Sequence, residues 1–168
     1  MTGARPGVIE RGTIEGRDVC VARDRLAVIG LSGERTTVVG AHSLADQFRA
    51  RGWEVLFCRF DLEHLHLDTL FCMLDANTAL AWVEALPPEF LASLELRGIR
   101  ILPARVEEAR QLGCNILSLA GRTILVAQGQ ERLIAMLEAA GFETVPVDTT
   151  GAAARRASFD DAPLANPG

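Results

Sequence analysis

The stretch that decides the fold is residues 18–60, DVCVARDRLAVIGLSGERTTVVGAHSLADQFRARGWEVLFCRF. Two runs rich in β-branched and aliphatic residues, Val19–Ala22 and Leu26–Leu31, flank a polar turn and predict a hairpin. Apolar residues at helical spacing predict a helix over Thr36–Arg51, and the glycine that follows ends it. The apolar run Trp53–Phe60 then returns as a strand. The stretch therefore predicts a strand–strand–helix–strand (ββαβ) unit.

The same order of elements occurs twice more along the chain. In the second unit the expected elements are strands at Leu65–Leu74 and Ala79–Val83, a helix at Pro88–Arg97 and a strand at Ile99–Leu102. In the third unit they are strands at Asn115–Leu119 and Thr123–Ala127, a helix at Gln130–Ala140 and a strand at Phe142–Val147. Such a repeat predicts a propeller or a stacked array, because one unit cannot bury its own apolar face. A generic α/β sandwich with coincidental periodicity is the alternative.

Composition restricts the class of protein. The chain has 168 residues, of which 49% are hydrophobic and 23% charged, as in one soluble globular domain with a real core. A net charge of −5 argues against nucleic-acid binding, and no apolar run is long enough to span a membrane. We expect one domain at residues 13–148, between a disordered N-terminus at 1–12 and a flexible tail at 149–168.

The cysteines indicate the compartment. They stand at positions 20, 58, 72 and 114 without any CxxC pair, a spacing that suits neither a zinc site nor a disulfide framework. Residues 1–10 lack the apolar segment of a secretory signal. The expected localisation is therefore cytoplasmic, and we expect no cofactor.

The densest polar cluster is the run from His64 to Asp68. On a strand, the side chains of His64, His66 and Asp68 would share one face, and an imidazole beside a carboxylate suits a general acid–base. The pattern H-x-H-x-D also supplies ligands in metal-dependent hydrolases. Only one other histidine, His42, is present, whereas a catalytic zinc needs three protein ligands, so we expect no metal. A strand whose polar face is merely solvated is the remaining alternative.

Two further polar clusters precede and follow the first hairpin. Glu15 and Asp18 lie just before the first strand, where carboxylates accept paired hydrogen bonds from a planar cation such as a guanidinium; an ordinary polar turn is the alternative. Residues 30–37, GLSGERTT, join a strand end to a helix. Their threonines are plausible N-caps, and Arg35 either binds a carboxylate or lies at the surface.

Taken in order, these stretches resemble the motifs of the guanidine-modifying superfamily of arginine deiminases, dimethylarginine dimethylaminohydrolases and amidinotransferases. Residues 14–19, IEGRDV, resemble E-G-G-D-V, and residues 30–36, GLSGERT, resemble G-x-S-x-R-T with one extra residue. Residues 66–75, HLDTLFCMLD, are similar to H-L-D-T-V-F-T-x-x-D, and residues 113–117, GCNIL, resemble a later G-x-N-x-L strand. The resemblance covers roughly residues 13–148.

The resemblance implies a five-bladed α/β propeller around a central substrate pocket, of which this chain would hold three blades, a partial propeller. It implies that His66 is the general acid–base and that Glu15 and Asp68 hold the substrate guanidinium. Arg35 would meet the substrate α-carboxylate, and Asp18 is also placed among the substrate-binding residues. The ligand would be an arginine-like guanidino compound, and the ancestral reaction C–N cleavage or amidino transfer.

The chain also departs from the family pattern. The family attacks the guanidinium carbon with a thiolate from a glycine-rich C-terminal stretch. Residues 151–164 keep Pro163-Leu164, but no cysteine follows Cys114, and the hydroxyl of Ser158 ionises far less readily than a thiol. Arg17 replaces a glycine and puts a cation beside the acids. We therefore consider two functions: a diverged, truncated or split enzyme, whose absent blades come from self-association or a partner chain, and a catalytically inactive binding module.

Overall fold

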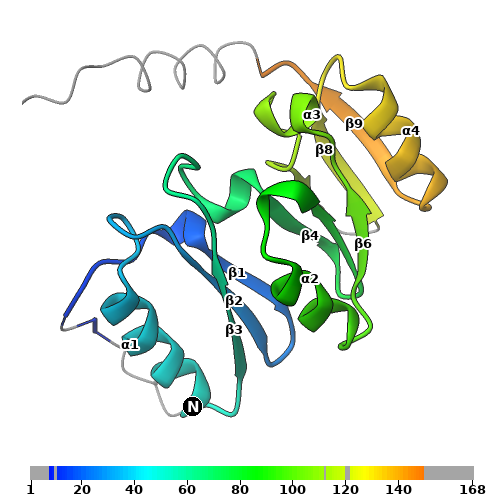
Figure 1. Ribbon diagram of the computed structural model, residues 1–168. Coiled ribbons are helices and arrows are strands. Elements are labelled where there is room, and N and C mark those ends of the chain that lie inside the picture. Colours follow the sequence, from blue (N-terminus) through cyan, green and yellow to red (C-terminus); the bar gives the residue numbers. More distant parts are fainter. Residues whose placement is uncertain (1–7, 10, 112, 120–121, 150–168) are drawn as a thin grey trace, which may run out of the picture.

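The computed structural model describes residues 8, 9, 11–111, 113–119 and 122–149. Within these ranges the chain forms three separate three-stranded sheets, each with its own helix (Figure 1). The expected ββαβ repeat is thereby confirmed. Most of the two expected tails, and with them Ser158 and Pro163-Leu164, lie outside the described residues.

The elements follow one another in the expected order. The first unit contains η1 (Gly16–Asp18), β1 (Val19–Arg23), β2 (Leu26–Leu31), α1 (Val38–Arg49) and β3 (Glu54–Arg59). The second contains η2 (Leu67–Thr69), β4 (Phe71–Asp75), β5 (Thr78–Ala81), η3 (Val83–Ala85), α2 (Pro88–Glu95) and β6 (Arg100–Pro103). After α3 (Val106–Arg110), the third contains β7 (Leu117–Ser118), β8 (Thr123–Ala127), α4 (Glu131–Ala139) and β9 (Glu143–Val147). The η elements are single 3₁₀ turns.

Each sheet has the same topology. Its first two strands form an antiparallel hairpin, and the third strand joins the second in parallel after a helical crossover. The first two hairpins agree in detail, because Cys20 pairs with Val28 as Cys72 pairs with Leu80, and both registers shift just before the turn. The first two units are thus close structural copies of one another.

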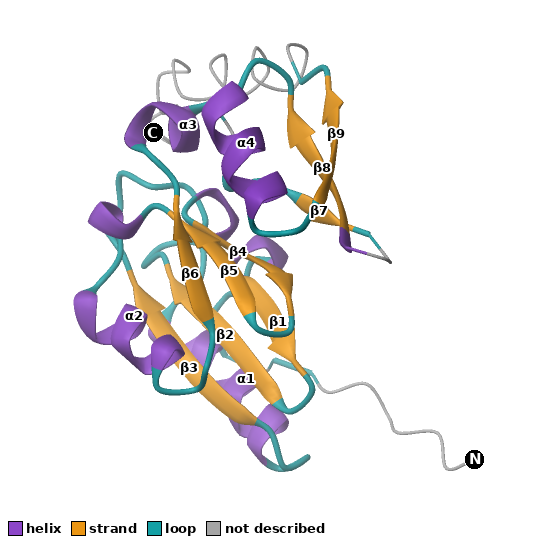
Figure 2. Cartoon of the chain, turned by 90° about the vertical axis from the view of Figure 1, so that its right-hand side faces the viewer, coloured by secondary structure: helices purple, strands orange, loops and turns teal. Residues whose placement is uncertain are grey.

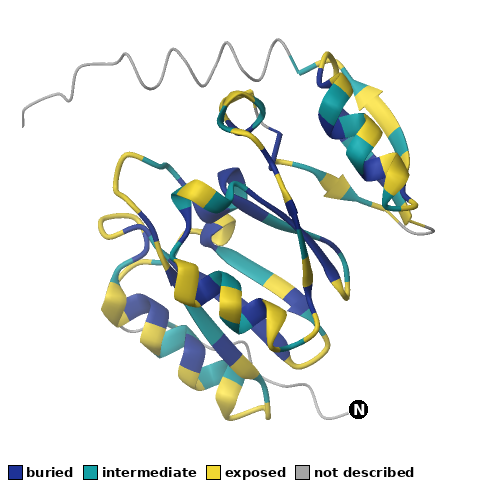
Figure 3. Cartoon of the chain, turned by 45° about the vertical axis from the view of Figure 1, so that its right-hand side comes forward, coloured by how far each residue is buried: buried dark blue, intermediate teal, exposed yellow. Residues whose placement is uncertain are grey.

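Helices and sheets alternate through the molecule (Figures 2 and 3). Helix α1 packs on the outer face of the first sheet, where Ala41 and Ala45 share a buried cluster with Ile29 and Val55. Helix α2 shares one core with the first and second sheets, and α4 shares another with the second and third sheets. Each of the first two sheets is therefore covered on one face by its own helix and on the other by the helix of the next unit.

Several boundaries differ from expectation. The expected strand Leu65–Leu74 is wrong in its first half, because residues 67–69 form a 3₁₀ turn and the strand begins at Phe71. The N–H of Leu67 donates to the carboxylate of Asp18 at 2.9 Å instead of joining a strand ladder. Strand β7 is shorter than expected, and α3 was not expected. Helix α1 begins after Thr37, whose hydroxyl accepts the Gly40 N–H at 3.2 Å, as the expected threonine N-cap would.

Among the helices that the structure describes, none is long and apolar enough to cross a membrane.

Candidate functional site

The polar motifs meet at two 3₁₀ turns, each placed just before the first strand of a unit. Turn η1 leads directly into β1, and η2 leads into β4 after one residue. The two turns contact one another, as do the strands that follow them. Stretches that are about fifty residues apart in the chain are thereby brought to the same end of neighbouring strands.

Asp18 is the centre of this arrangement. Its side chain is fully buried, and its Oδ2 accepts hydrogen bonds from the hydroxyls of Ser32 (2.7 Å) and Thr36 (2.6 Å). Its Oδ1 accepts the Leu67 N–H. A buried carboxylate is tolerated only when its oxygens are hydrogen-bonded. One side chain thus joins the three motifs, and its oxygens face protein groups and not the surface at which a ligand would arrive.

His66 lies against Asp18 in a nearly closed environment. Its Nδ1 is 3.6 Å from Asp18 Oδ1, and this nitrogen has no hydrogen-bond partner among the described residues. Burial lowers the pKa of His66, and the charges of Arg17 and Arg35 lower it further against the opposing effect of the two aspartates. The imidazole is therefore neutral at neutral pH, the form in which a histidine accepts a proton.

Asp68 makes an ion pair with Arg17. Its Oδ2 accepts the Arg17 Nε–H at 2.7 Å, and the amide of Asn115 donates to the same oxygen at 3.5 Å. The other oxygen, Oδ1, is buried and accepts no hydrogen bond from the described residues. The expectation that His66 and Asp68 share one strand face is wrong, because the 3₁₀ turn directs His66 to Asp18 and Asp68 to Arg17.

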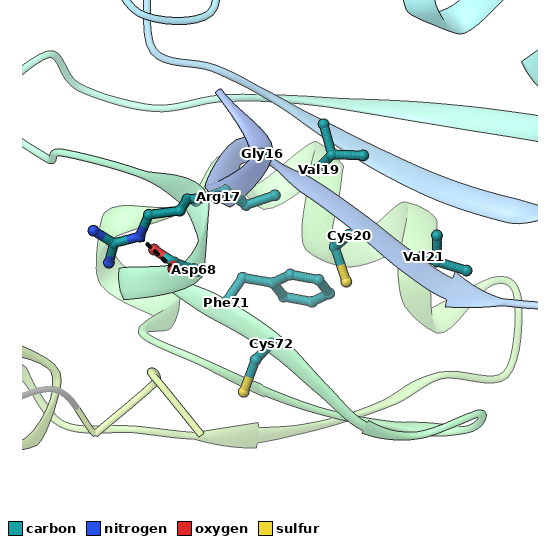
Figure 4. Close-up of a pocket in the computed structure, with 9 residues that line it drawn as sticks. Gly16, Arg17, Val19, Cys20, Val21, Asp68, Phe71 and Cys72 are labelled. Carbon is teal, nitrogen blue, oxygen red and sulfur yellow. Dashed lines mark hydrogen bonds and ion pairs between the residues drawn. The ribbon is translucent and has the colours of Figure 1, made fainter. Parts of the chain in front are cut away.

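The Arg17–Asp68 pair lies at one end of a pocket of about 450 Å³ between β1 and β4 (Figure 4). The pocket is lined by Gly16, Arg17, Val19, Cys20, Val21, Leu67, Asp68, Phe71 and Cys72. Its wall is apolar except at the ion pair. This arrangement suits a ligand with one cationic end and a short aliphatic body.

Arg35 and His64 belong to a second, smaller pocket of about 200 Å³. Arg35 is exposed and donates from Nη1 to the Leu65 carbonyl at 3.3 Å. The ring of His64 packs edge-on against Trp82 at 5.1 Å between centroids. The structure therefore separates His64 from His66, although the sequence placed them on one face.

Glu15 is exposed, and its side chain makes no hydrogen bond or ion pair with the described residues. Its backbone N–H donates to the Thr36 hydroxyl at 3.0 Å, which fixes the backbone before η1. Sequence reasoning missed the part that Ser32 and Thr36 play around Asp18. The signal was present, since these are the serine and the threonine of the stretch that resembles G-x-S-x-R-T.

None of the four cysteines offers a thiolate. Burial raises the pKa of Cys20 to about 11 and the pKa values of Cys58 and Cys114 to about 12. The pKa of Cys72 is also raised well above its ordinary value by burial. Because the thiolate is the nucleophile, these thiols are inert at neutral pH. The described residues also contain no group of three or more His, Cys, Asp or Glu side chains that could hold a metal ion.

Three ββαβ units, with an imidazole and carboxylates just before the first strands of the first two units, define the guanidine-modifying superfamily as the class of this protein. The arginine deiminase family model matches residues 2–86, and the chain belongs to that family. A relative, the uncharacterized protein YkgA of Bacillus subtilis, is 24% identical over 136 residues, which are 81% of this chain and 46% of the relative.

Solved structures show the same fold. Dimethylarginine dimethylaminohydrolase from Pseudomonas aeruginosa, a cysteine-to-serine mutant complexed with citrulline, superposes with a TM-score of 0.70 and 25% identity, covering 84% of this chain and 51% of the enzyme. The N-terminal domain of ArgZ, a cyanobacterial arginine dihydrolase bound to its substrate, gives a TM-score of 0.70 with 23% identity, over 81% and 50% of the two chains. This chain thus spans about half the length of these relatives, and its fold is a partial α/β propeller.

Proposed function

We propose that this chain carries the guanidinium-binding and proton-transfer part of a guanidine-modifying site, and that by itself it binds an arginine-like compound without turning it over. The observation that supports the proposal is Asp68, which lies at the rim of an apolar pocket with a buried oxygen that accepts no hydrogen bond from the described residues. A buried carboxylate oxygen without a hydrogen bond costs free energy, so a ligand that donates a hydrogen bond to it is favoured. A guanidinium offers two parallel N–H groups that fit a carboxylate.

The remaining residues receive roles within this proposal. His66 is neutral and close to the ion pair, which suits it to exchange a proton with a bound guanidino group. Asp18 positions His66 and the backbone of η2 and does not itself touch the ligand. Arg35 meets the α-carboxylate of an amino-acid ligand in the smaller pocket, and Glu15 adds a second carboxylate near the guanidinium.

The absence of turnover follows from the four protonated thiols. A guanidinium carbon is attacked by a strong nucleophile, and no cysteine of this chain ionises at neutral pH. A second candidate is an enzyme in which another chain supplies the thiolate and the remaining blades. The position of the His66 imidazole, with Nδ1 3.6 Å from the Asp18 carboxylate, favours it, since a binding module has no need of a general acid–base.

The first prediction tests ligand binding through Asp68. L-Arginine should shift the backbone NMR signals of η1 and η2, whereas citrulline, which lacks the cationic guanidinium, should do so much more weakly. Asp68→Asn should weaken arginine binding roughly tenfold or more, because it removes a charge-assisted hydrogen-bond acceptor. Asp46→Asn, at an exposed carboxylate of α1, is the matched control and should leave binding unchanged.

The same samples test whether the chain alone turns arginine over, which neither candidate expects. The purified chain should release no ammonia or ornithine from arginine. Release that persists after all four cysteines are replaced would show that the nucleophile lies elsewhere in the chain. If millimolar arginine shifts the η1 and η2 signals neither in the wild type nor in Arg17→Ala, which lacks the ion pair and keeps the Asp68 carboxylate, the proposed function is wrong.

A further inference from the structure

We propose that Arg17 is a built-in ligand of the guanidinium site, whose side chain occupies the Asp68 carboxylate and must leave before an external guanidino compound binds. This inference rests on the proposed function and concerns what sets its affinity. Arg17 would then be the residue that determines which ligands compete successfully for the site.

The chemistry of the ion pair supports substitution by an external ligand. Arg17 presents to Asp68 the same functional group that an arginine-like ligand would present. It does so through Nε alone, at 2.7 Å from Oδ2, and its two terminal nitrogens make no hydrogen bond with the described residues. The Arg17 guanidinium therefore donates only its Nε–H to the Asp68 carboxylate.

The other half of the carboxylate remains unsatisfied. Oδ1 of Asp68 is buried and accepts no hydrogen bond from the described part of the chain, even with Arg17 in place. A free guanidinium that approaches in the plane of the carboxylate donates to both oxygens. An external ligand of this kind thus makes one hydrogen bond more than Arg17 does, and ligands that offer a single donor do not gain this advantage.

The built-in guanidinium is also free to leave. The Arg17 and Asp68 side chains are 44% and 32% exposed, so water replaces Arg17's contacts when it moves away. Because the Arg17 side chain already lies partly in solvent, swinging it out requires no repacking of the core.

A different role for the pair is a structural tie between the first and second units, since Arg17 belongs to η1 and Asp68 to η2. A tie and a competitor predict opposite results when Arg17 is removed. Loss of a tie lowers stability and loosens Asp68, so ligand binding weakens. Loss of a competitor leaves the carboxylate free, so ligand binding strengthens.

The experiment is an NMR titration of the full chain with methylguanidine and L-arginine. Arg17→Ala should bind both ligands about three- to tenfold more tightly than the wild type, the size expected when a half-exposed, tethered ion pair stops competing. Arg17→Lys keeps the charge and a single contact and should lie between the two. Arg49→Ala, at another exposed arginine paired with an aspartate, is the matched control and should bind as the wild type does.

The outcomes separate this inference from the proposed function. Equal binding by wild type and Arg17→Ala, or weaker binding by Arg17→Ala while Arg17→Lys binds normally, overturns the built-in ligand and leaves ligand binding in place. Binding by neither protein overturns both proposals. Tighter binding by Arg17→Ala that disappears in Arg17→Ala/Asp68→Asn supports the inference, because the gain then requires the released carboxylate.

Discussion

Asp18 has no access to solvent, and yet it is the residue through which the site is built. Its two oxygens receive the hydroxyls of Ser32 and Thr36 and the N–H of Leu67. These hydrogen bonds replace the water that a carboxylate loses on burial. These hydrogen bonds thereby fix a loop, a turn and a helix start relative to one another.

The polar residues of the site were recognisable from the sequence, but their directions were not. His66 and Asp68 stand two positions apart, which on a strand places them on one face. The reasoning failed because the Asp18 carboxylate captures the Leu67 N–H, and a side chain about fifty residues away is invisible to a local pattern. The only sequence signal for the ion pair of Arg17 with Asp68 was the arginine itself, at a position where the family motif has a glycine.

A residue-scale prediction concerns the pH dependence of stability. Because the pKa of His66 is lowered in the folded chain, chiefly by burial, the unfolded chain binds a proton first as the pH falls below the ordinary histidine value of about 6.5. The contribution of His66 to the free energy of unfolding is therefore fully present above that pH, and it is lost as the pH falls toward the lower pKa of the folded state. On going from pH 7.5 to 5, urea denaturation should show a larger loss of stability in the wild type than in His66→Gln.

The control for this comparison is His42→Gln, at an exposed histidine of α1. It should follow the wild-type pH dependence. Parallel curves for the wild type and His66→Gln would mean that His66 titrates alike in the folded and unfolded states. The description of His66 as a buried, neutral imidazole would then be wrong.

At the scale of elements, the periodicity of apolar residues was sufficient to predict a helix or strand wherever that element packs through one regular face. The helices α1, α2 and α4 and the strands of the first two sheets, apart from the start of β4, lie within a few residues of their expected bounds, because their apolar residues recur with the period of the element. The short elements η1, η2 and α3 have too few turns to carry a period. Turns η1 and η2 hold Arg17, Asp18 and Asp68, and His66 directly precedes η2, so the scaffold was better predicted than the site.

An element-scale prediction concerns the contact of β2 with η2. A Cβ at Gly30 would lie 2.9 Å from both Leu67 Cβ and Phe60 Cε1, so the turn approaches the strand only where a side chain is absent. Gly30→Ala should lower the free energy of unfolding by about 1–3 kcal/mol, the usual cost of overpacking. Urea denaturation measures it, and the weakened η2 should also bind arginine less well.

Gly16→Ala provides the comparison, since a Cβ there meets nothing within 4 Å. Its stability should change by less than about 0.5 kcal/mol. Equal stability of the two variants would show that Gly30 has room for a methyl group and that the close approach of β2 and η2 is not required.

At the scale of the whole molecule, the alternation of helices and sheets stops at the third sheet. Its inner face packs on α4, but no described helix covers its outer face. A row of register partners, Leu117, Leu125 and Val145, crosses that face, and Leu117 and Val145 are 57% and 40% exposed. At the other end of the described fold, α1 exposes Val38 and Val39. The repeat in the sequence predicted three units, but it did not say what covers the two ends.

These two ends are complementary, because inside the molecule the face of a sheet that its own helix leaves uncovered is covered by the helix of the following unit. The outer face of the third sheet in one copy therefore offers the surface on which α1 of a second copy can pack. Exposed apolar rows of this kind mark interfaces. We expect the isolated chain to self-associate through this contact, in a concentration-dependent manner at micromolar protein.

The test is sedimentation equilibrium of the wild type and of Leu117→Lys/Val145→Lys. The double variant should associate at least about tenfold more weakly, because two charges would be buried without partners at the centre of the contact. Its stability should change little, since both side chains already lie partly in solvent. Leu96→Lys, at an even more exposed leucine that follows α2, is the matched control and should associate as the wild type does. A wild type that remains monomeric with cooperative unfolding would show that the three units are self-sufficient, and the outer face of the third sheet would then be an ordinary surface.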